Sequence, residues 1–230
     1  MRLLDFIFPK YCVNCKKFGD YLCANCFSRL SFDTKNICLV CGNPSYDGKT
    51  HPNCRKRNSP EGVFTGVVFN KISKKLIYQF KYRPYLFGLS VFIADLLYDS
   101  LIQDEEFAKV SNLPLVLVPV PLSSRKFKKR GYNQAEVLAK ELGKKLNIKV
   151  IDCLERTRET ITQVGLGKKE RRENIKDAFI VKKKYEESFK NMNILIVDDV
   201  LTTGATIYEA TMVLKKSGSS KVWGVAFARE

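Results

Sequence analysis

The chain has 230 residues, of which 45% are hydrophobic and 28% charged, as in ordinary folded proteins. This composition excludes a collagen-like, coiled-coil or wholly disordered chain, and no apolar run approaches the ~20 residues of a membrane-spanning helix. The length predicts one full domain with a smaller appendage. The apolar stretch Leu3–Phe8 contains an aspartate and is too short for a signal-peptide core, which predicts a cytosolic protein.

The charge is strongly unbalanced, with 40 lysines and arginines against 24 acidic residues and a net charge of +16. Such a surface attracts polyanions: nucleic acid, phosphorylated metabolites or the anionic inner face of a membrane. Charge alone does not separate these three classes. The sequence has one histidine, His51, near its start, so the rest of the chain cannot hold a Ser-His-Asp or Cys-His catalytic site.

The first 59 residues differ in pattern from the rest of the chain. They lack hydrophobic periodicity and are interrupted by Gly, Asn, Asp and Pro. A segment of this length without a core cannot fold alone, so something else must stabilise it. The charged run and turn residues at 55–60 suggest a boundary there. We therefore predict a small module over residues 1–59 and a larger domain over residues 60–230.

The larger part alternates short apolar runs with helical stripes. We expect strands at Val63–Phe69, Leu115–Val120, Ile194–Val197 and Lys221–Ala228. Apolar residues at helical spacing predict helices around residues 72–80, 89–97, 135–146 and 207–214. Buried strands alternating with amphipathic helices predict an α/β fold: a mostly parallel sheet with helices on both faces.

Cysteines are concentrated at the start of the chain. Four ligand pairs share the spacing of two intervening residues: Cys12 with Cys15, Cys23 with Cys26, Cys38 with Cys41, and His51 with Cys54. This spacing lets one tight turn aim both side chains at a tetrahedral ion. Eight ligands predict two structural zinc sites, each contributing about 10–16 kcal/mol to the folded module. The remaining cysteine, Cys153, is predicted to be a core residue.

Other interpretations of the cysteines fit less well. Disulfides are unusual in a cytosolic chain, and iron–sulfur ligands are usually less regularly paired. Two complete sets of four ligands leave no open position for metal catalysis. The sequence allows the first pair to join the second and the third to join the fourth, and it equally allows crossed pairing.

The segment 194–206 combines features of a phosphate site. Four apolar residues are followed by Asp198 and Asp199 and then by a hydroxyl-rich turn into a helix. Amide groups at that helix start can bind a phosphate, and Gly204 permits close backbone approach. The carboxylates suit vicinal hydroxyls and an accompanying Mg²⁺, so the expected ligand contains ribose 5-phosphate. The predicted binding residues are Asp198, Asp199, Thr202, Thr203, Gly204, Ala205 and Thr206. The alternative is a helix cap in which the aspartates only form the turn.

This segment resembles the binding motif for 5-phosphoribosyl 1-diphosphate (PRPP) of type I phosphoribosyltransferases. The resemblance implies that Asp198 and Asp199 bind the ribose hydroxyls and that Thr202–Thr206 bind the 5-phosphate. Val118–Leu122, followed by Arg125 and by Arg130–Ala135, resembles the signature of the ComF family, with tyrosine at 132 where phenylalanine is more usual. The paired cysteines and Lys81-Tyr82 fit that family too.

The ComF resemblance covers essentially the whole chain and implies a zinc-ribbon-like module before a phosphoribosyltransferase-type domain. It implies a role in natural competence, with single-stranded DNA and other competence proteins as partners. His51 stands where that family pattern has a cysteine. The resemblance leaves open whether catalysis occurs, and no segment indicates an acceptor. An active phosphoribosyltransferase of nucleobase or nucleotide metabolism is therefore the alternative.

Basic and aromatic segments add further expectations. The run 125–130 is a solvated loop, a nucleic-acid contact or a pyrophosphate site, for which Arg125 and Arg130 are the candidates. Residues 156–176 suit a mobile lid or a disordered connector, and 182–190 a solvated connector. Four aromatic residues lie among the cysteines and either cover the zinc module or stack on bases: Tyr11, Phe18, Tyr21 and Phe27.

Overall fold

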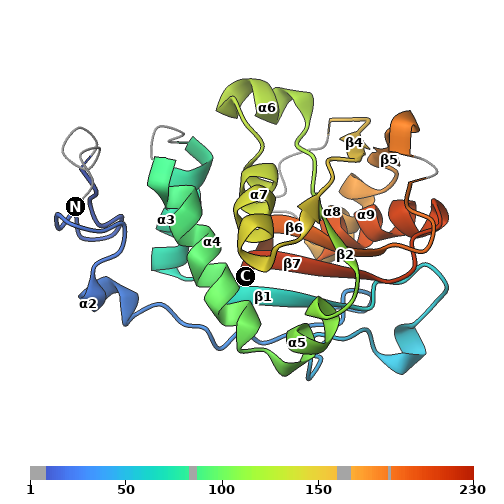
Figure 1. Ribbon diagram of the computed structural model, residues 1–230, viewed down its shortest axis with the longest axis horizontal. Helices are drawn as coiled ribbons and strands as arrows, with labels where there is room; N and C mark the ends of the chain where they lie inside the picture. Colours follow the sequence, from blue (N-terminus) through green and yellow to red (C-terminus); the bar gives the residue numbers. More distant parts are fainter. Residues whose placement is uncertain (1–8, 83–86, 160–166, 186–187) are drawn as a thin grey trace.

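A parallel sheet forms the centre of the molecule (Figure 1). The computed structural model describes residues 9–82, 87–159, 167–185 and 188–230. The five strands lie in the order β1-β7-β6-β2-β3 and every neighbouring pair is parallel. They are β1 (Gly62–Val68), β2 (Leu115–Pro119), β3 (Lys149–Val150), β6 (Asn193–Leu201) and β7 (Val222–Arg229). A separate antiparallel pair joins β4 (Leu154–Arg156) to β5 (Phe179–Val181). The predicted fold class is confirmed.

Helices cover both faces of this sheet. The four expected helices are α3 (Lys71–Tyr82), α4 (Phe87–Ile102), α7 (Gln134–Leu146) and α9 (Ala205–Lys216). The structure adds α2 (Ala24–Phe27), α5 (Glu105–Ser111), α6 (Ser124–Arg130), α8 (Lys168–Ile175) and two short 3₁₀ turns, Pro52–Cys54 and Lys183–Tyr185. Helices α4 and α7 pack on one face of the sheet, and α9 packs on the other. Each of the helices described is too short or too polar to cross a bilayer.

The sequence of strand β6 contains a continuous apolar run because the strand is covered on both faces. Ile194 and Ile196 belong to the core on the α9 side, whereas Leu195 and Val197 belong to the core under α4 and α7. Side chains alternate between the two faces of a strand, so a strand covered on both faces needs apolar residues at every position. All four of these residues are fully buried.

The same strand is longer than the sequence predicted. It continues past Val197, through the acidic pair, to Leu201. The reason is its parallel partner β7, which pairs Asp198 with Ala226 and Leu201 with Arg229. The two aspartates therefore lie on a fixed strand rather than in a free turn, which holds their carboxylates in place.

The carboxyl ends of β2 and β6 form the switch point of the sheet. The chain passes from β2 to β3 on one side and from β6 to β7 on the other. Pro119 lies opposite Val197, and the Val120 amide donates to the Val197 carbonyl at 3.0 Å. Open α/β sheets bind ligands in the crevice at such a point. Here it brings the basic helix α6, which follows β2, beside the acidic pair of β6.

The N-terminal segment runs along the edge strand β1 (Figure 1). The Val68 amide donates to the Ser31 carbonyl at 2.8 Å, and the Val63 amide donates to the Gly48 carbonyl at 3.0 Å. Backbone bonding of this kind occupies polar groups that an open edge would expose. The sheet thus helps to hold a segment that has no core of its own. The division into two modules at residue 59 stays a prediction.

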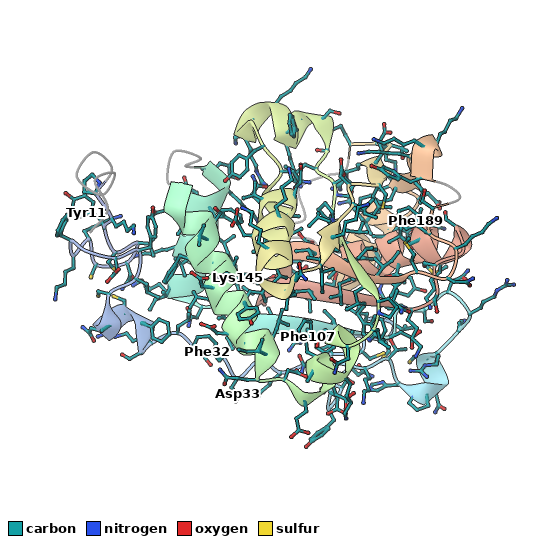
Figure 2. All side chains as sticks on the ribbon, in the orientation of Figure 1. Tyr11, Phe32, Asp33, Phe107, Lys145 and Phe189 are labelled. Atoms are coloured by element: carbon teal, nitrogen blue, oxygen red, sulfur yellow. The ribbon has the colours of Figure 1, made fainter. Side chains whose placement is uncertain are left out.

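Two segments predicted to be connectors are more ordered than expected. Within 156–176, Arg156 ends β4 and α8 begins at Lys168, while the intervening 160–166 lie outside the described residues. A disordered connector is therefore wrong for the described part, because Ile175 at the end of α8 enters the core. Segment 182–190 is not wholly solvated, since Phe189 is fully buried (Figure 2). Cys153 is buried, as predicted.

Candidate functional site: a phosphate crevice and two metal centres

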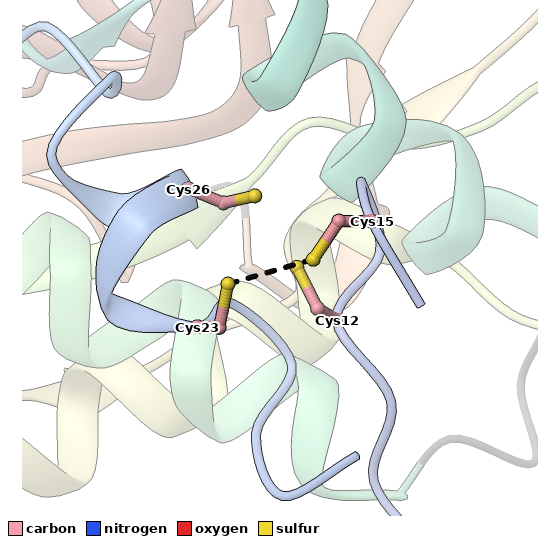
Figure 3. A group of neighbouring side chains, drawn as sticks. All are labelled: Cys12, Cys15, Cys23 and Cys26. Atoms are coloured by element: carbon pink, nitrogen blue, oxygen red, sulfur yellow. Dashed lines mark hydrogen bonds between the residues drawn. The ribbon is translucent and has the colours of Figure 1, made fainter. Parts of the chain in front are cut away.

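The first cysteine cluster has the geometry of a tetrahedral metal site (Figure 3). The sulfur atoms of Cys12, Cys15, Cys23 and Cys26 all lie within 4.8 Å of one another. The sulfurs of Cys15 and Cys23 are 3.5 Å apart. Zinc bonds of about 2.3 Å in a tetrahedron require about 3.8 Å between sulfurs, so the four residues fit zinc. The first pair thus joins the second, and crossed pairing is excluded.

The second cluster consists of Cys38, Cys41, His51 and Cys54, whose ligand atoms also lie within 4.8 Å of one another. His51 Nδ1 is 3.4 Å from the Cys41 sulfur, and His51 Nε2 is 3.0 Å from the Pro44 carbonyl oxygen. A carbonyl accepts from Nε2–H, which leaves the Nδ1 lone pair facing the cysteines. The histidine therefore fits as the fourth ligand. Both sets are complete, as a structural zinc site requires.

Backbone amides prepare one buried cysteine in each cluster for metal binding. Burial opposes ionisation of Cys12, but the amides of Cys15, Cys23 and Asn14 outweigh it and lower the pKa to about 6. Burial likewise opposes ionisation of Cys38, and amide groups around it lower its pKa to about 7. The thiolate is the form that binds zinc, so both environments favour the metal-bound state.

The turn between β6 and α9 brings the predicted phosphate residues together. Thr202, Thr203 and Gly204 form the turn, and Ala205 and Thr206 begin α9. Gly204 has φ of 74°, in the left-handed region that favours glycine. The Ala205 amide lies 3.4 Å from Thr203 Oγ1. The first amide groups of a helix lack partners within the helix, so this twelve-residue helix presents donors at the crevice.

The acidic pair is held by a lysine that sequence analysis assigned no role. Lys81, near the end of α3, lies 2.6 Å from Asp199 Oδ2, and both side chains are mostly buried. The Asp199 amide donates to Asp198 Oδ1 at 2.8 Å. Burial and the neighbouring Asp199 charge raise the pKa of Asp198 to about 7. One carboxylate is therefore paired with a cation, and the other is only partly ionised near neutral pH.

Further cations surround the carboxylates. Burial and the charges of Arg156, Arg130 and Lys81 lower the pKa of Lys126, while the charge of Asp198 opposes this shift. Burial also lowers the pKa of Arg156, again against the charge of Asp198. This group of half-buried cations suits a polyanion such as pyrophosphate. Lys126 could not be distinguished from neighbouring lysines in the sequence, and Arg156 comes from a distant strand.

The two arginines predicted for pyrophosphate lie in different surroundings. Arg130 is half-buried, donates to Gln134 Oε1 at 2.6 Å and belongs to the cation group. The Arg125 side chain is exposed, and its backbone amide donates to Glu159 at 2.8 Å. Both assignments stay predictions.

Comparisons with known proteins agree with this architecture. The double zinc ribbon domain family matches residues 3–55, and the phosphoribosyl transferase domain family matches residues 128–229. Competence protein F of Haemophilus influenzae is 34% identical over 214 residues, which cover 90% of each chain. This chain belongs to the ComF family.

Two further relatives support the assignment. Competence protein ComFC of Bacillus subtilis is 29% identical over 217 residues, which cover 86% of this chain and 80% of that protein. DNA utilization protein YhgH of Escherichia coli strain K12 is 30% identical over 211 residues, which cover 87% of each chain. These ComF relatives span both the zinc-ribbon part and the phosphoribosyltransferase-type part.

Proposed function

We propose that this ComF-family chain binds PRPP with Mg²⁺ in the crevice between β2 and β6, and that it acts in natural competence. The observation that carries the proposal is the switch point of the sheet. There the turn into α9 and the carboxylates of β6 face the cations of α3, α6 and β4. A ligand with a diol, a phosphate and a diphosphate matches these groups in number and in charge.

Each part of PRPP has a partner in this proposal. The ribose hydroxyls donate to Asp198 and Asp199, and the 5-phosphate accepts from the amides of Thr203–Thr206. Lys126 and Arg156 bind the diphosphate, whose accompanying Mg²⁺ neutralises part of its charge. Ribose hydroxyls at Asp199 compete with the Lys81 ion pair, so the lysine is released toward the diphosphate when the ligand binds.

The names of the relatives support the biological role. Two are competence proteins and one is a DNA utilization protein. A cytosolic location, with access to the inner face of the membrane and to other competence proteins, goes with this role. The net positive charge of the chain suits contact with DNA and with the anionic inner face of the membrane.

A double substitution of the acidic pair tests PRPP binding. At pH 8, where Asp198 is mostly ionised, Asp198→Asn with Asp199→Asn should weaken PRPP binding by roughly 2–5 kcal/mol, because two charge-assisted hydrogen bonds are lost. Isothermal titration calorimetry measures the affinity, and circular dichroism checks the fold. Asp95→Asn in α4, whose carboxylate pairs with Lys145 rather than with a residue of the crevice, is the matched control and should bind PRPP as the wild type does. Unchanged affinity in a folded double variant contradicts the site.

Single-stranded DNA is the proposed second ligand, supported by an exposed aromatic pair on α3. Tyr78 and Tyr82 are 60% and 40% exposed, and their ring centroids lie 5.0 Å apart. Lys129 and Arg130 of α6 lie over the Tyr82 ring at 5.7 and 5.3 Å. Aromatic faces beside cations bind single strands through base stacking and phosphate contacts.

This surface continues toward the first zinc region, the segment that contains Cys12, Cys15, Cys23 and Cys26. Lys75 of α3 donates to Asn14 Oδ1 at 2.9 Å. Beyond it, Tyr11 and Phe18 are 50% and 59% exposed, with ring centroids 5.8 Å apart (Figure 2 labels Tyr11). Tyr21, by contrast, is buried in the core. The aromatic residues of the zinc module are therefore divided between covering the core and facing solvent.

A salt series tests the DNA surface. Lys128→Ser with Lys129→Ser should make the slope of log affinity against log salt shallower by about 1.4, if both lysines contact phosphates. Fluorescence anisotropy of a labelled single strand provides the measurement. Lys140→Ser with Lys144→Ser, exposed lysines of α7, is the control and should leave the slope unchanged. A wild type whose affinity does not depend on salt would reject this surface.

Catalytic phosphoribosyl transfer is the alternative function, favoured by the cations around the diphosphate position. In such a reaction the bond between C1 and the diphosphate oxygen breaks, and an acceptor atom forms the new bond to C1. Fixed carboxylates and cations would stabilise the separating charges without covalent chemistry. Release of pyrophosphate from PRPP with a panel of bases and nucleosides, with and without DNA, tests this alternative.

A further inference from the structure

The turn at residues 202–204, called the phosphate turn below, packs against the second zinc region, the segment that contains Cys38, Cys41, His51 and Cys54. Leu39 lies between the ligands Cys38 and Cys41 and is fully buried in the core that contains Leu201 and Ala205. A Cβ atom on Gly204 would collide with Leu39 Cδ2 and would lie 3.7 Å from Leu39 Cγ. Position 204 therefore requires glycine for two reasons: its φ is positive, and Leu39 packs against it.

The metal ligands fix the position of this leucine. The Gly42 amide donates to the Cys38 carbonyl at 2.7 Å, and the His51 amide lies 3.5 Å from the Cys38 sulfur. These bonds close a tight knuckle around Leu39. A zinc ion bound by Cys38 and Cys41 would hold both ends of the knuckle, so that the leucine has little freedom to move away from Gly204.

Helix α8 joins the same knuckle to α9. Arg172 Nη2 donates to the Leu39 carbonyl at 3.1 Å and to the Val40 carbonyl. Its guanidinium lies 5.8 Å from the ring centroid of Tyr208, and the Tyr208 amide donates to the Gly204 carbonyl at 2.9 Å. Knuckle, α8 and the first turn of α9 thus form one connected group around the phosphate turn.

The first zinc region has different neighbours. Asn14, between Cys12 and Cys15, bonds to Lys75 of α3, and Tyr21 packs against Phe92 of α4 with ring centroids 6.2 Å apart. These contacts lead to the α3 and α4 side of the sheet rather than to the α9 side. The two metal centres are alike in chemistry, but they support different parts of the molecule.

We propose that the second zinc knuckle, through Leu39 and Arg172 as positioning residues, controls the phosphate turn, so that metal at this site and the phosphoribosyl ligand bind cooperatively. This inference rests on the proposed binding of PRPP. Linkage is reciprocal, so the ligand should strengthen zinc binding at the second site by the same factor by which zinc strengthens ligand binding. The first site takes no part in this coupling.

Matched leucine variants test the positioning role. Leu39→Ala should weaken PRPP binding roughly tenfold, within the usual range of coupling between sites, and Leu39→Met should restore most of the loss. Leu22→Ala, a buried leucine of the first zinc region, should lower the melting temperature by a similar amount but leave PRPP affinity unchanged. Equal affinities in the two alanine variants would overturn the proposal.

A second measurement does not depend on PRPP. In the ligand-free protein, Cys54→Ser should speed hydrogen exchange of the amides at 203–206 at least several-fold, whereas Cys15→Ser should not, because local protection reports local opening. Unchanged exchange in Cys54→Ser overturns the inference even where PRPP binds to the wild type. Failure of the wild type to bind PRPP, with the expected exchange pattern, overturns the proposed ligand and leaves the coupling intact.

Discussion

The two zinc regions have the same spacing within each ligand pair but contact opposite sides of the sheet. Between Cys12 and Cys15 lies Val13, buried in the core with α3 and α4, together with the hydrogen-bonding Asn14. Between Cys38 and Cys41 lies Leu39, buried in the core with α9. The ligands determine that each knuckle forms. The two residues between them determine what the knuckle supports.

The proposed coupling would give a structural metal an influence on a neighbouring binding site without an open coordination position. Both sites have complete ligand sets, so neither can activate water or bind substrate directly. The influence of the second site instead passes through van der Waals contact and hydrogen bonds to carbonyls. Such contacts act within a few ångströms, so location decides which of two similar sites is coupled to the crevice.

The largest expected effect comes from removing one buried ligand of each site. Cys12→Ser and Cys38→Ser should each reduce the zinc content from two ions to one and cost on the order of 5 kcal/mol or more, because a structural zinc contributes about 10–16 kcal/mol. PRPP binding should survive only in Cys12→Ser. Elemental analysis, thermal melting and calorimetry provide the three readouts. One zinc in the wild type would contradict the presence of two sites. Equal loss of PRPP binding in both variants would contradict the difference in their roles.

A smaller effect is expected at α8, where adjacent arginines differ in their contacts. Arg172→Gln should destabilise the protein by about 1.5–3 kcal/mol and weaken PRPP binding several-fold, since it removes charged donors from the Leu39 and Val40 carbonyls. Arg171→Gln removes a partly exposed pair with Glu230 and should cost less than about 1 kcal/mol. Chemical denaturation and calorimetry distinguish the two. Similar PRPP affinities would argue against the link through α8.

The smallest effect concerns pH and should be independent of both zinc regions. The pKa of Asp198 is raised to about 7 in the folded protein, from an ordinary value of 3.8. The native state therefore holds this proton more tightly, and its stability falls as pH rises from about 4 through 7. Asp198→Asn should remove the free-energy cost of ionising this buried carboxyl group. It should therefore stabilise the ligand-free protein at pH 8 by about 1–3 kcal/mol, with little gain at pH 4.

The same carboxylate predicts the pH dependence of binding. PRPP affinity should increase between pH 6 and 8, because only ionised Asp198 offers both oxygens as acceptors. Leu22→Ala and Leu39→Ala should retain this dependence, since neither changes β6. Titrations in buffers of matched ionic strength provide the measurement. A wild-type affinity that does not vary over this range would contradict the role of Asp198.

The sequence was sufficient for features whose residues are close together in the chain. The apolar run of β6, the following turn and the start of α9 form one continuous motif, and each zinc ligand pair is a local spacing. Joining the pairs in chain order required the structure. So did the extension of β6 through Asp198 and Asp199, because pairing with β7 causes it.

For other parts of the site, no sequence feature indicated that they lie together. Lys81, Lys126 and Arg156 belong to three distant elements, and only the fold brings their charges to the same carboxylates. Helix α6 has no buried residue and therefore no apolar stripe by which it could be predicted. The contact between Leu39 and Gly204 joins residues from the two predicted modules, so neither module alone could indicate it.

The covering of strand β1 by residues 31–48 has a practical consequence for anyone handling this protein. A fragment starting at residue 60 would leave the amides of Val63 and Val68 without their partners on an unprotected sheet edge. Unprotected edges pair with other chains, so such a fragment should aggregate during expression rather than report the properties of the larger domain. Zinc supply during synthesis would then decide how much protein is recovered, because the covering segment depends on metal for its shape.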